Sequence, residues 1–181
     1  MARISRFFII LLMGLILLTA CSQQKSYVFV VNPSRDPEAT KQLKAPALIK
    51  SLNRQGVQVV QIGDTLRIIL PSDMIFNPRS ANFSSGSRVL DNVAYLMLML
   101  RTTQAEVAGF TNAMPAQAAR ALSLRQAQVV ANYLWERGID SRILYAVGYG
   151  TSEPMSSVPV DPANRRVEIR FQFLHYGVGR Y

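Results

Sequence analysis

The segment VAGFTNAMPAQAARALSLRQAQVV, residues 107–130, holds the side chains with the clearest potential for binding. Its apolar start, residues 107–110, ends at a hydroxyl and an amide, Thr111 and Asn112, and a helix-like stretch follows. A strand end that opens onto a helix is a common place for a ligand. This strand end offers an amide and a hydroxyl but no acid, no histidine and no metal ligand, which leaves open what it binds.

Catalysis is not expected from this chain. His175 is the only histidine, and it lies in a short segment, residues 175–181, that we expect to be a C-terminal tail. The sequence contains no G-x-S-x-G motif and no cluster of metal ligands. We therefore predict a protein that is not an enzyme, with no catalytic residue, no metal site and no cofactor.

The only cysteine, Cys21, stands where an export signal should be cut. Arg3 and Arg6 form a positive head, and an apolar run follows at residues 7–18. This run is shorter than the roughly 20 residues that a membrane-spanning helix needs. The layout predicts a signal peptide at residues 1–20, cleaved before Cys21.

The letters LTAC, residues 18–21, resemble the lipobox of bacterial lipoproteins. The resemblance implies that Cys21 is acylated; the alternative is a plain signal peptide with a chance cysteine. Two acyl chains anchor a protein stably where a single chain does not. The residue after the cysteine is Ser22 and not aspartate. By resemblance to the sorting rule of bacterial lipoproteins, this favours transport of the protein to the outer membrane. We expect a protein held by its acyl chains at the periplasmic face of that membrane.

The chain is basic, with a formal net charge of +9 over 181 residues. Its arginines are scattered rather than clustered, so the charge suits weak attraction to anionic surroundings such as the cell wall or lipid headgroups. No basic run with interleaved aromatic residues occurs, and we expect no nucleic-acid partner.

The order of the remaining elements predicts the fold class. Residues 21–46 are expected to be the lipid anchor and a tether, in which YVFVV, residues 27–31, forms a short strand or adds to the sheet edge of a partner. A short helix is expected to stop at Gly56, and two alternating runs joined at Gly63-Asp64 predict a β-hairpin. Helix, strand, helix, strand and strand follow. The resulting ββ-α-β-α-β-β order predicts an α+β sandwich with helices packed on one face of a mixed sheet.

The two long helices are placed by their periodicity and capping signals. The first is expected at residues 87–101, with a buried stripe of Leu90, Val93, Ala94, Met97 and Leu100, widened by Leu98 and Met99. For the second, Ser123 and Gln126 form the pattern of a capping box, which predicts that this helix begins at Leu124.

Several short motifs together resemble the OmpA-like C-terminal domain, the peptidoglycan-binding fold of Pal and MotB. They are FNPRSANF at 76–83, VAGFTN at 107–112, LSLRQAQVVANYL at 122–134, GID at 138–140, GYGTSEP at 148–154 and NRRVEI at 164–169. The family motifs span residues 70–171, and we expect the domain to cover 47–174.

The resemblance implies a site for diaminopimelate, the zwitterionic residue in the stem peptide of the wall. The family places Asp in a His-Thr-Asp motif and Arg in an L-S-x-x-R-A motif, and here these positions hold Asn112 and Gln126. A neutral amide does not neutralise a charged group, and the loss is about 1.5–3 kcal/mol per hydrogen bond. We expect weak peptidoglycan binding, unless Arg125 or Arg120 replaces the missing cation. The candidate binding residues are Thr111, Asn112, Ser123, Arg125, Gln126, Asn164 and Arg165.

The last strand alternates between two faces. Arg166, Glu168 and Arg170 share one face, and the residues between them are apolar. Two interpretations stay open for the charged face: a solvated surface with a cross-strand ion pair, which stabilises little, or contact with a ligand.

The lipobox, the proline-bearing tether and the altered site are similar to lipoproteins of the Dot/Icm type IVB secretion system. This resemblance implies a structural component of an outer-membrane core complex at the cell wall, with other secretion-system proteins as partners. The alternative is a working peptidoglycan tether of the Pal type.

Overall fold

The computed structural model describes residues 44–112 and 114–174. The expected signal peptide, Cys21, the YVFVV segment and the tail at 175–181 lie outside the described residues. No helix within the described ranges is long and apolar enough to cross a membrane.

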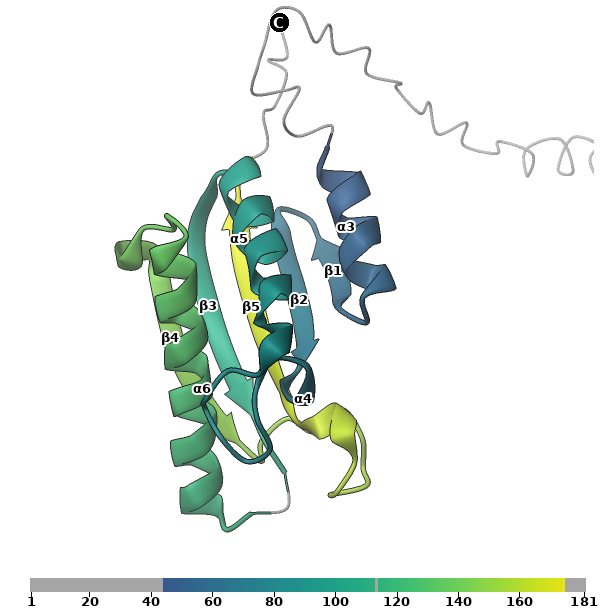
Figure 1. Ribbon diagram of the computed structural model, residues 1–181, viewed down its shortest axis with the longest axis vertical. Helices are drawn as coiled ribbons and strands as arrows, with labels where there is room; N and C mark the ends of the chain where they lie inside the picture. Colours follow the sequence, from purple (N-terminus) through teal and green to yellow (C-terminus); the bar gives the residue numbers. More distant parts are fainter. Residues whose placement is uncertain (1–43, 113, 175–181) are drawn as a thin grey trace, which may run out of the picture. The chain divides into compact units, whose positions relative to one another are not determined.

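A five-stranded mixed sheet forms the centre of the domain (Figure 1). Its order is β1-β2-β5-β3-β4. The strands are β1 (Gln58–Ile62), β2 (Thr65–Pro71), β3 (Thr102–Phe110), β4 (Leu144–Gly150) and β5 (Arg166–Phe173). Only β3 and β4 pair in parallel, and the other neighbours are antiparallel. The predicted α+β class, the mixed sheet and the order of these elements along the chain are confirmed.

The hairpin follows directly from its turn residues. Ile62 pairs with Thr65, so only Gly63 and Asp64 lie between the strands. Gly63 has a φ of 57°, a conformation that favours glycine and suits a two-residue hairpin turn. Along β2, alternate apolar side chains then point into the core.

Three helices lie on one face of the sheet (Figure 1). They are α3 (Ala45–Arg54), α5 (Val89–Met99) and α6 (Ala116–Glu136), and the short α4 (Ser72–Ile75) and η2 (Ser85–Arg88) connect β2 to α5. The predicted stripe of α5 is buried, as is Met99, but Leu98 is 48% exposed. The prediction for Leu98 was wrong because its direction on the helix turns it away from the sheet.

Helix α6 begins at Ala116, after Pro115, and not at Leu124 as the capping pattern predicted. The alanine-rich stretch before Ser123 has high helix propensity and continues the helix backwards. Ser123 is therefore an interior residue: its hydroxyl donates to the carbonyl of Arg120 at 3.1 Å and accepts from the backbone N–H of Gly150 at 2.9 Å. The serine ties the helix to β4 instead of capping it.

Two glycines allow α6 to lie directly on the sheet. A Cβ atom at Gly109 of β3 would stand 2.0 Å from the backbone oxygen of Ser123, and one at Gly148 of β4 would stand 2.5 Å from the backbone nitrogen of Leu124. No side chain fits in these gaps. The close approach fixes the N-terminal half of α6 against the ends of β3 and β4.

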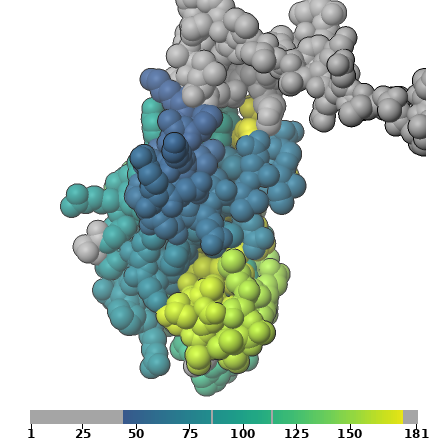
Figure 2. Space-filling view, turned by 90° about the vertical axis from the view of Figure 1, so that its right-hand side faces the viewer, coloured from purple at the N-terminus to yellow at the C-terminus, as the bar shows by residue number. Residues whose placement is uncertain are grey.

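The segment between β4 and β5 packs beside the hairpin. Figure 2 shows it in yellow-green as a compact lobe next to the blue hairpin. The short η4 (Pro162–Asn164) lies within it. Met155 and Pro162 from the lobe line a small cavity together with Gln58 and Ile69 of the hairpin.

Candidate functional site

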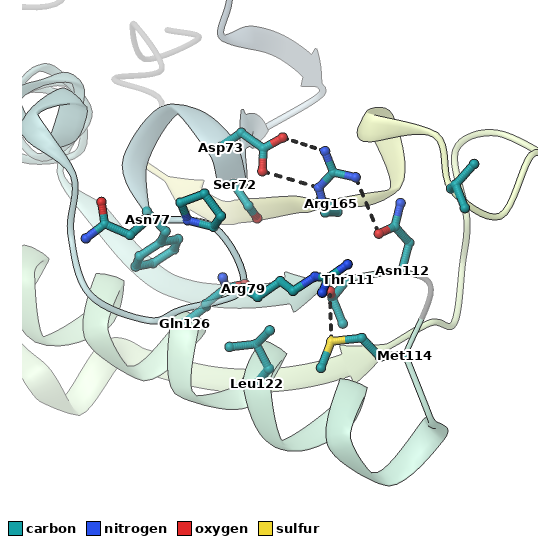
Figure 3. A pocket seen from close by; sticks show the side chains of 13 residues that line it. Ser72, Asp73, Asn77, Arg79, Thr111, Asn112, Met114, Leu122, Gln126 and Arg165 are labelled. Atoms are coloured by element: carbon teal, nitrogen blue, oxygen red, sulfur yellow. Dashed lines mark hydrogen bonds and ion pairs between the residues drawn. The ribbon is translucent and has the colours of Figure 1, made fainter.

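A cavity of about 420 Å³ opens where β3 ends, between α4, the loop that follows it, α6 and the β4–β5 lobe (Figure 3). The segment that ended in Thr111 and Asn112 thus reaches a real pocket. Its lining residues are Ser72, Asp73, Phe76, Asn77, Pro78, Arg79, Thr111, Asn112, Met114, Leu122, Gln126, Val160 and Arg165.

Four of the seven candidate residues line this pocket: Thr111, Asn112, Gln126 and Arg165. They come from three separate parts of the chain, namely the end of β3, the middle of α6 and the start of β5. Thr111 is fixed by its backbone N–H, which donates to the carbonyl of Gly150 at 2.8 Å. The structure therefore brings the predicted segments to one place.

Asn164 and Ser123 lie outside the pocket and make structural hydrogen bonds within the domain. The Asn164 amide accepts from the backbone N–H of Ser156 and donates to the carbonyls of Ser156 and Val158, at 2.9, 3.1 and 3.0 Å. These bonds close the β4–β5 lobe on itself. Ser123 is fully buried between α6 and β4. Neither side chain is available to a ligand in this pocket.

The two arginines considered as replacements for the missing cation are exposed and do not line the pocket. Arg125 is next to Gln126 on α6, and one residue turns the side chain by about 100°. Arg120 lies about one and two-thirds turns before Gln126 and also faces solvent. In this arrangement neither guanidinium takes the place of an arginine at position 126.

The amide groups of Asn112 and Gln126 are held in one orientation by backbone carbonyls. Gln126 Nε2 donates to the carbonyl of Ser80 at 2.8 Å, and Asn112 Nδ2 donates to the carbonyl of Asp161 at 2.8 Å. A carbonyl only accepts, so each amide must turn its nitrogen toward it. Asn112 Oδ1 then accepts from Arg165 Nη1 at 3.5 Å, whereas Gln126 Oε1 is buried without a partner.

Asp73 and Arg165 form an ion pair on the pocket wall (Figure 3). Arg165 Nη2 and Nε donate to the Asp73 carboxylate at 2.5 and 3.2 Å, and this bonding raises the pKa of Arg165. Asp73 was not among the predicted site residues. It lies there because β2 pairs with β5, with Pro71 opposite Arg166. No local pattern in the sequence indicates that pairing.

Arg79 adds a second cation to the pocket. It lies in the loop after α4, is exposed and, within the described residues, has no ion-pair partner. In Figure 3 its side chain extends across the pocket toward Thr111. With Asp73 and Arg165, this gives the pocket lining one negative and two positive groups.

The charged face of β5 is buried, which corrects the interpretation of a solvated surface. Glu168 is 0% exposed and Arg166 is 2% exposed. Glu168 accepts from Arg67, Arg166 and Arg170 at 2.6, 2.7 and 2.7 Å, so the predicted cross-strand ion pair is present. Burial alone would raise the pKa of Glu168, but the three guanidiniums outweigh it and lower the pKa to about 2.

Aromatic rings cover this charged cluster. The Arg166 guanidinium lies 3.7 Å from the ring centre of Phe110, and Phe110 stacks on Tyr149 at 5.0 Å. Arg166 Nη2 also donates to the carbonyl of Glu153 in the β4–β5 lobe at 2.9 Å. The cluster therefore links the sheet to the β4–β5 lobe. None of its residues lines the pocket, although the neighbouring Arg165 does.

The described part of the chain, residues 44–112 and 114–174, contains no group of three or more acidic, histidine or cysteine side chains that could hold a metal ion. What the pocket offers is hydrogen bonding and charge: the amide oxygen of Gln126, the hydroxyls of Ser72 and Thr111, the Asp73–Arg165 ion pair, and the Arg79 guanidinium, which has no ion-pair partner among the described residues.

Comparison with known proteins gives a family and a fold. The sequence profile of the OmpA family matches residues 75–168. No curated protein gives a significant match to the chain. A MotB-like protein from Desulfovibrio vulgaris has 21% identity and a TM-score of 0.65, over 76% of this chain and 95% of that one. The cell wall anchor of the T6SS from Pseudomonas aeruginosa has 25% identity and a TM-score of 0.64, over 72% and 96%. The periplasmic domain of Helicobacter pylori MotB has 24% identity and a TM-score of 0.58, over 67% and 82%.

Proposed function

Because the chain belongs to the OmpA family, we propose that its domain sits in the periplasm against the peptidoglycan of the cell wall. There it is a structural component of a type IVB (Dot/Icm) secretion-system core complex. Acyl chains on Cys21 hold it to the outer membrane, and residues 22–44 form the tether. The domain is a non-catalytic interaction module with a weak diaminopimelate site.

The proposal that diaminopimelate binds weakly rests on the hydrogen bonds of the Asn112 and Gln126 side chains. Both line the pocket, and both amides are bonded to backbone carbonyls. Neither side chain supplies the formal charge that a zwitterionic ligand requires from its receptor. The single carboxylate of the pocket, on Asp73, is already paired with Arg165. Diaminopimelate would therefore lose hydration without gaining matched charges.

Two resemblances support the role in a secretion system. The chain resembles the IcmN (DotK) lipoprotein in its lipobox, its proline-bearing tether and its altered site. The fold is also similar to that of the cell wall anchor of the T6SS from Pseudomonas aeruginosa, which supports the role by analogy. The alternative, a working tether of the Pal type, is favoured by the Asp73–Arg165 pair and Arg79, which leave charged groups in the pocket.

Peptidoglycan sedimentation tests the weak site. We expect the wild-type chain to show no saturable binding that diaminopimelate competes for. The double variant Asn112→Asp with Gln126→Arg restores both charges and should raise competable binding by about tenfold or more. Arg125→Gln changes the charge of the same helix outside the pocket and should leave binding unchanged. Tight, competable binding by the wild-type chain would instead support the Pal-type tether.

Photo-crosslinking in cells tests the secretion-system role. A crosslinking residue in place of Tyr27 or Met114 should give products with other proteins of the secretion complex. Cys21→Ser, which prevents acylation, should remove these products because the domain then leaves the outer membrane. Crosslinks that are confined to wall-binding proteins unrelated to secretion, or that are insensitive to Cys21→Ser, would count against the proposal.

A further inference from the structure

We propose that the pocket binds an acylated carboxylate: a ligand end that carries an amide N–H and a carboxylate, and no ammonium group. The carboxyl end of a peptide has this chemistry. The inference rests on the proposed function, because it states what the same pocket recognises at the wall once its diaminopimelate charges are absent.

Two buried polar groups in the pocket lining favour a ligand with a neutral hydrogen-bond donor. Gln126 is 4% exposed, and its Oε1 has no partner, while its Nε2 is bonded to Ser80. A buried acceptor without a partner costs about 1–3 kcal/mol, and a ligand N–H recovers this free energy. Ser72, also 4% exposed, has an unpartnered hydroxyl in the same lining. The position at which the family holds a cation therefore holds an acceptor here.

An ammonium group is disfavoured as that donor. The only carboxylate in the lining belongs to Asp73, and two hydrogen bonds from Arg165 occupy it. Arg79 and Arg165 outnumber it, so the lining has a net charge of −1 + 2 = +1. A buried positive charge would face this excess without an anion of its own. A neutral amide N–H meets the same acceptor at no such cost.

The Arg79 guanidinium is positioned to bind an anionic group of a ligand. Arg79 has no ion-pair partner within the described residues, and its side chain extends over the pocket (Figure 3). A guanidinium binds a carboxylate through two parallel hydrogen bonds, which makes the pair strong and directional. A ligand with its amide at Gln126 and its carboxylate at Arg79 therefore satisfies both open groups. A cavity of about 420 Å³ is large enough for one such residue.

Ligand-observed NMR titration of the full chain in detergent tests this preference. The probes are N-acetyl-D-alanine, which has the proposed chemistry, and D-alanine and diaminopimelate, which carry ammonium groups. We expect the Kd for N-acetyl-D-alanine to be lower by about tenfold or more. N-acetyl-L-alanine tests the source: preference for the D form supports a wall peptide as the ligand, and preference for the L form, which is the carboxyl end of a protein, would overturn that assignment.

Three variants check the assignment. Arg79→Gln, at an exposed position that leaves the fold intact, should raise the Kd for N-acetyl-D-alanine about tenfold. Gln126→Met removes the acceptor and should raise it about fivefold. Arg125→Gln removes a neighbouring charge outside the pocket and should leave it unchanged. Equal or tighter binding of diaminopimelate, no saturable binding of N-acetyl-D-alanine, or insensitivity to Arg79→Gln would overturn the inference. Crosslinking to the secretion complex reports on the proposed function independently of all these titrations.

Discussion

Replacing Glu168 by Gln is expected to lower the free energy of unfolding by about 3–5 kcal/mol, because it leaves buried positive charge without its partner. Glu168 is fully buried and receives hydrogen bonds from three arginines. Arg166, at 2% exposure, has no route to solvent. Urea unfolding of wild type and variant at neutral pH measures the difference.

The same cluster makes stability depend on pH in a defined direction. The pKa of Glu168 falls from its ordinary value of 4.5 to about 2 in the folded protein. A carboxyl group with a lowered pKa stabilises the fold above its unfolded pKa and loses that contribution as the pH falls. We expect a loss of stability between about pH 4.5 and pH 2 that is absent from Glu168→Gln.

Asp140 provides a matched control for burial. Its carboxylate is bonded to Arg142, which lowers the pKa to about 2 as well, but the pair is on the surface. Exposed ion pairs contribute little because water and salt screen them. Asp140→Asn should therefore unfold at nearly the wild-type urea concentration. Equal effects of the two substitutions would show that the buried cluster is not what stabilises the sheet.

The second large effect is expected from Gly109→Ala, with a loss of about 2–4 kcal/mol. The added Cβ would lie 2.0 Å from the backbone oxygen of Ser123, and a helix backbone does not move aside as a flexible side chain does. Helix α6 would have to lift from β3, which weakens the bond between Ser123 and Gly150. Thermal and urea unfolding measure the loss of stability. Ligand titration should show weaker binding, because the pocket wall formed by α6 is displaced.

Gly63→Ala separates crowding from backbone conformation. Gly63 has a φ of 57°, but no atom lies within 4 Å of the position of an added Cβ. Its substitution should cost only about 1 kcal/mol, the price of a left-handed conformation for alanine. If Gly109→Ala is no more destabilising than Gly63→Ala, the helix does not rest on the sheet as closely as described.

Local patterns were sufficient to predict most of the fold. The hairpin depends on the Gly63-Asp64 turn and the alternation around it, and the buried face of α5 depends on helical spacing. Both signals lie within short stretches of sequence. The start of α6 could not be predicted in this way, because Ser123 and Gln126 fit a capping box while their partners, Gly150 and Ser80, lie far away in sequence.

The site was predictable only where it follows from single elements. Asn112 and Gln126 stand at a strand end and on a helix, and both line the pocket. Asp73 contacts Arg165 because β2 pairs with β5, and these two strands lie far apart in the sequence. The burial of Arg166 likewise depends on Phe110 and the β4–β5 lobe, which contact its guanidinium. Such contacts are set by tertiary structure, which a single sequence does not reveal.

The strand order has a consequence for how the protein folds. β5 is the last strand in the chain, yet it lies in the middle of the sheet between β2 and β3. Until β5 has emerged, the hairpin and the β3–β4 pair have no common partner, and neither half can close a core. The sheet therefore closes its core only after β5 is available, so folding depends on contacts between residues far apart in the sequence.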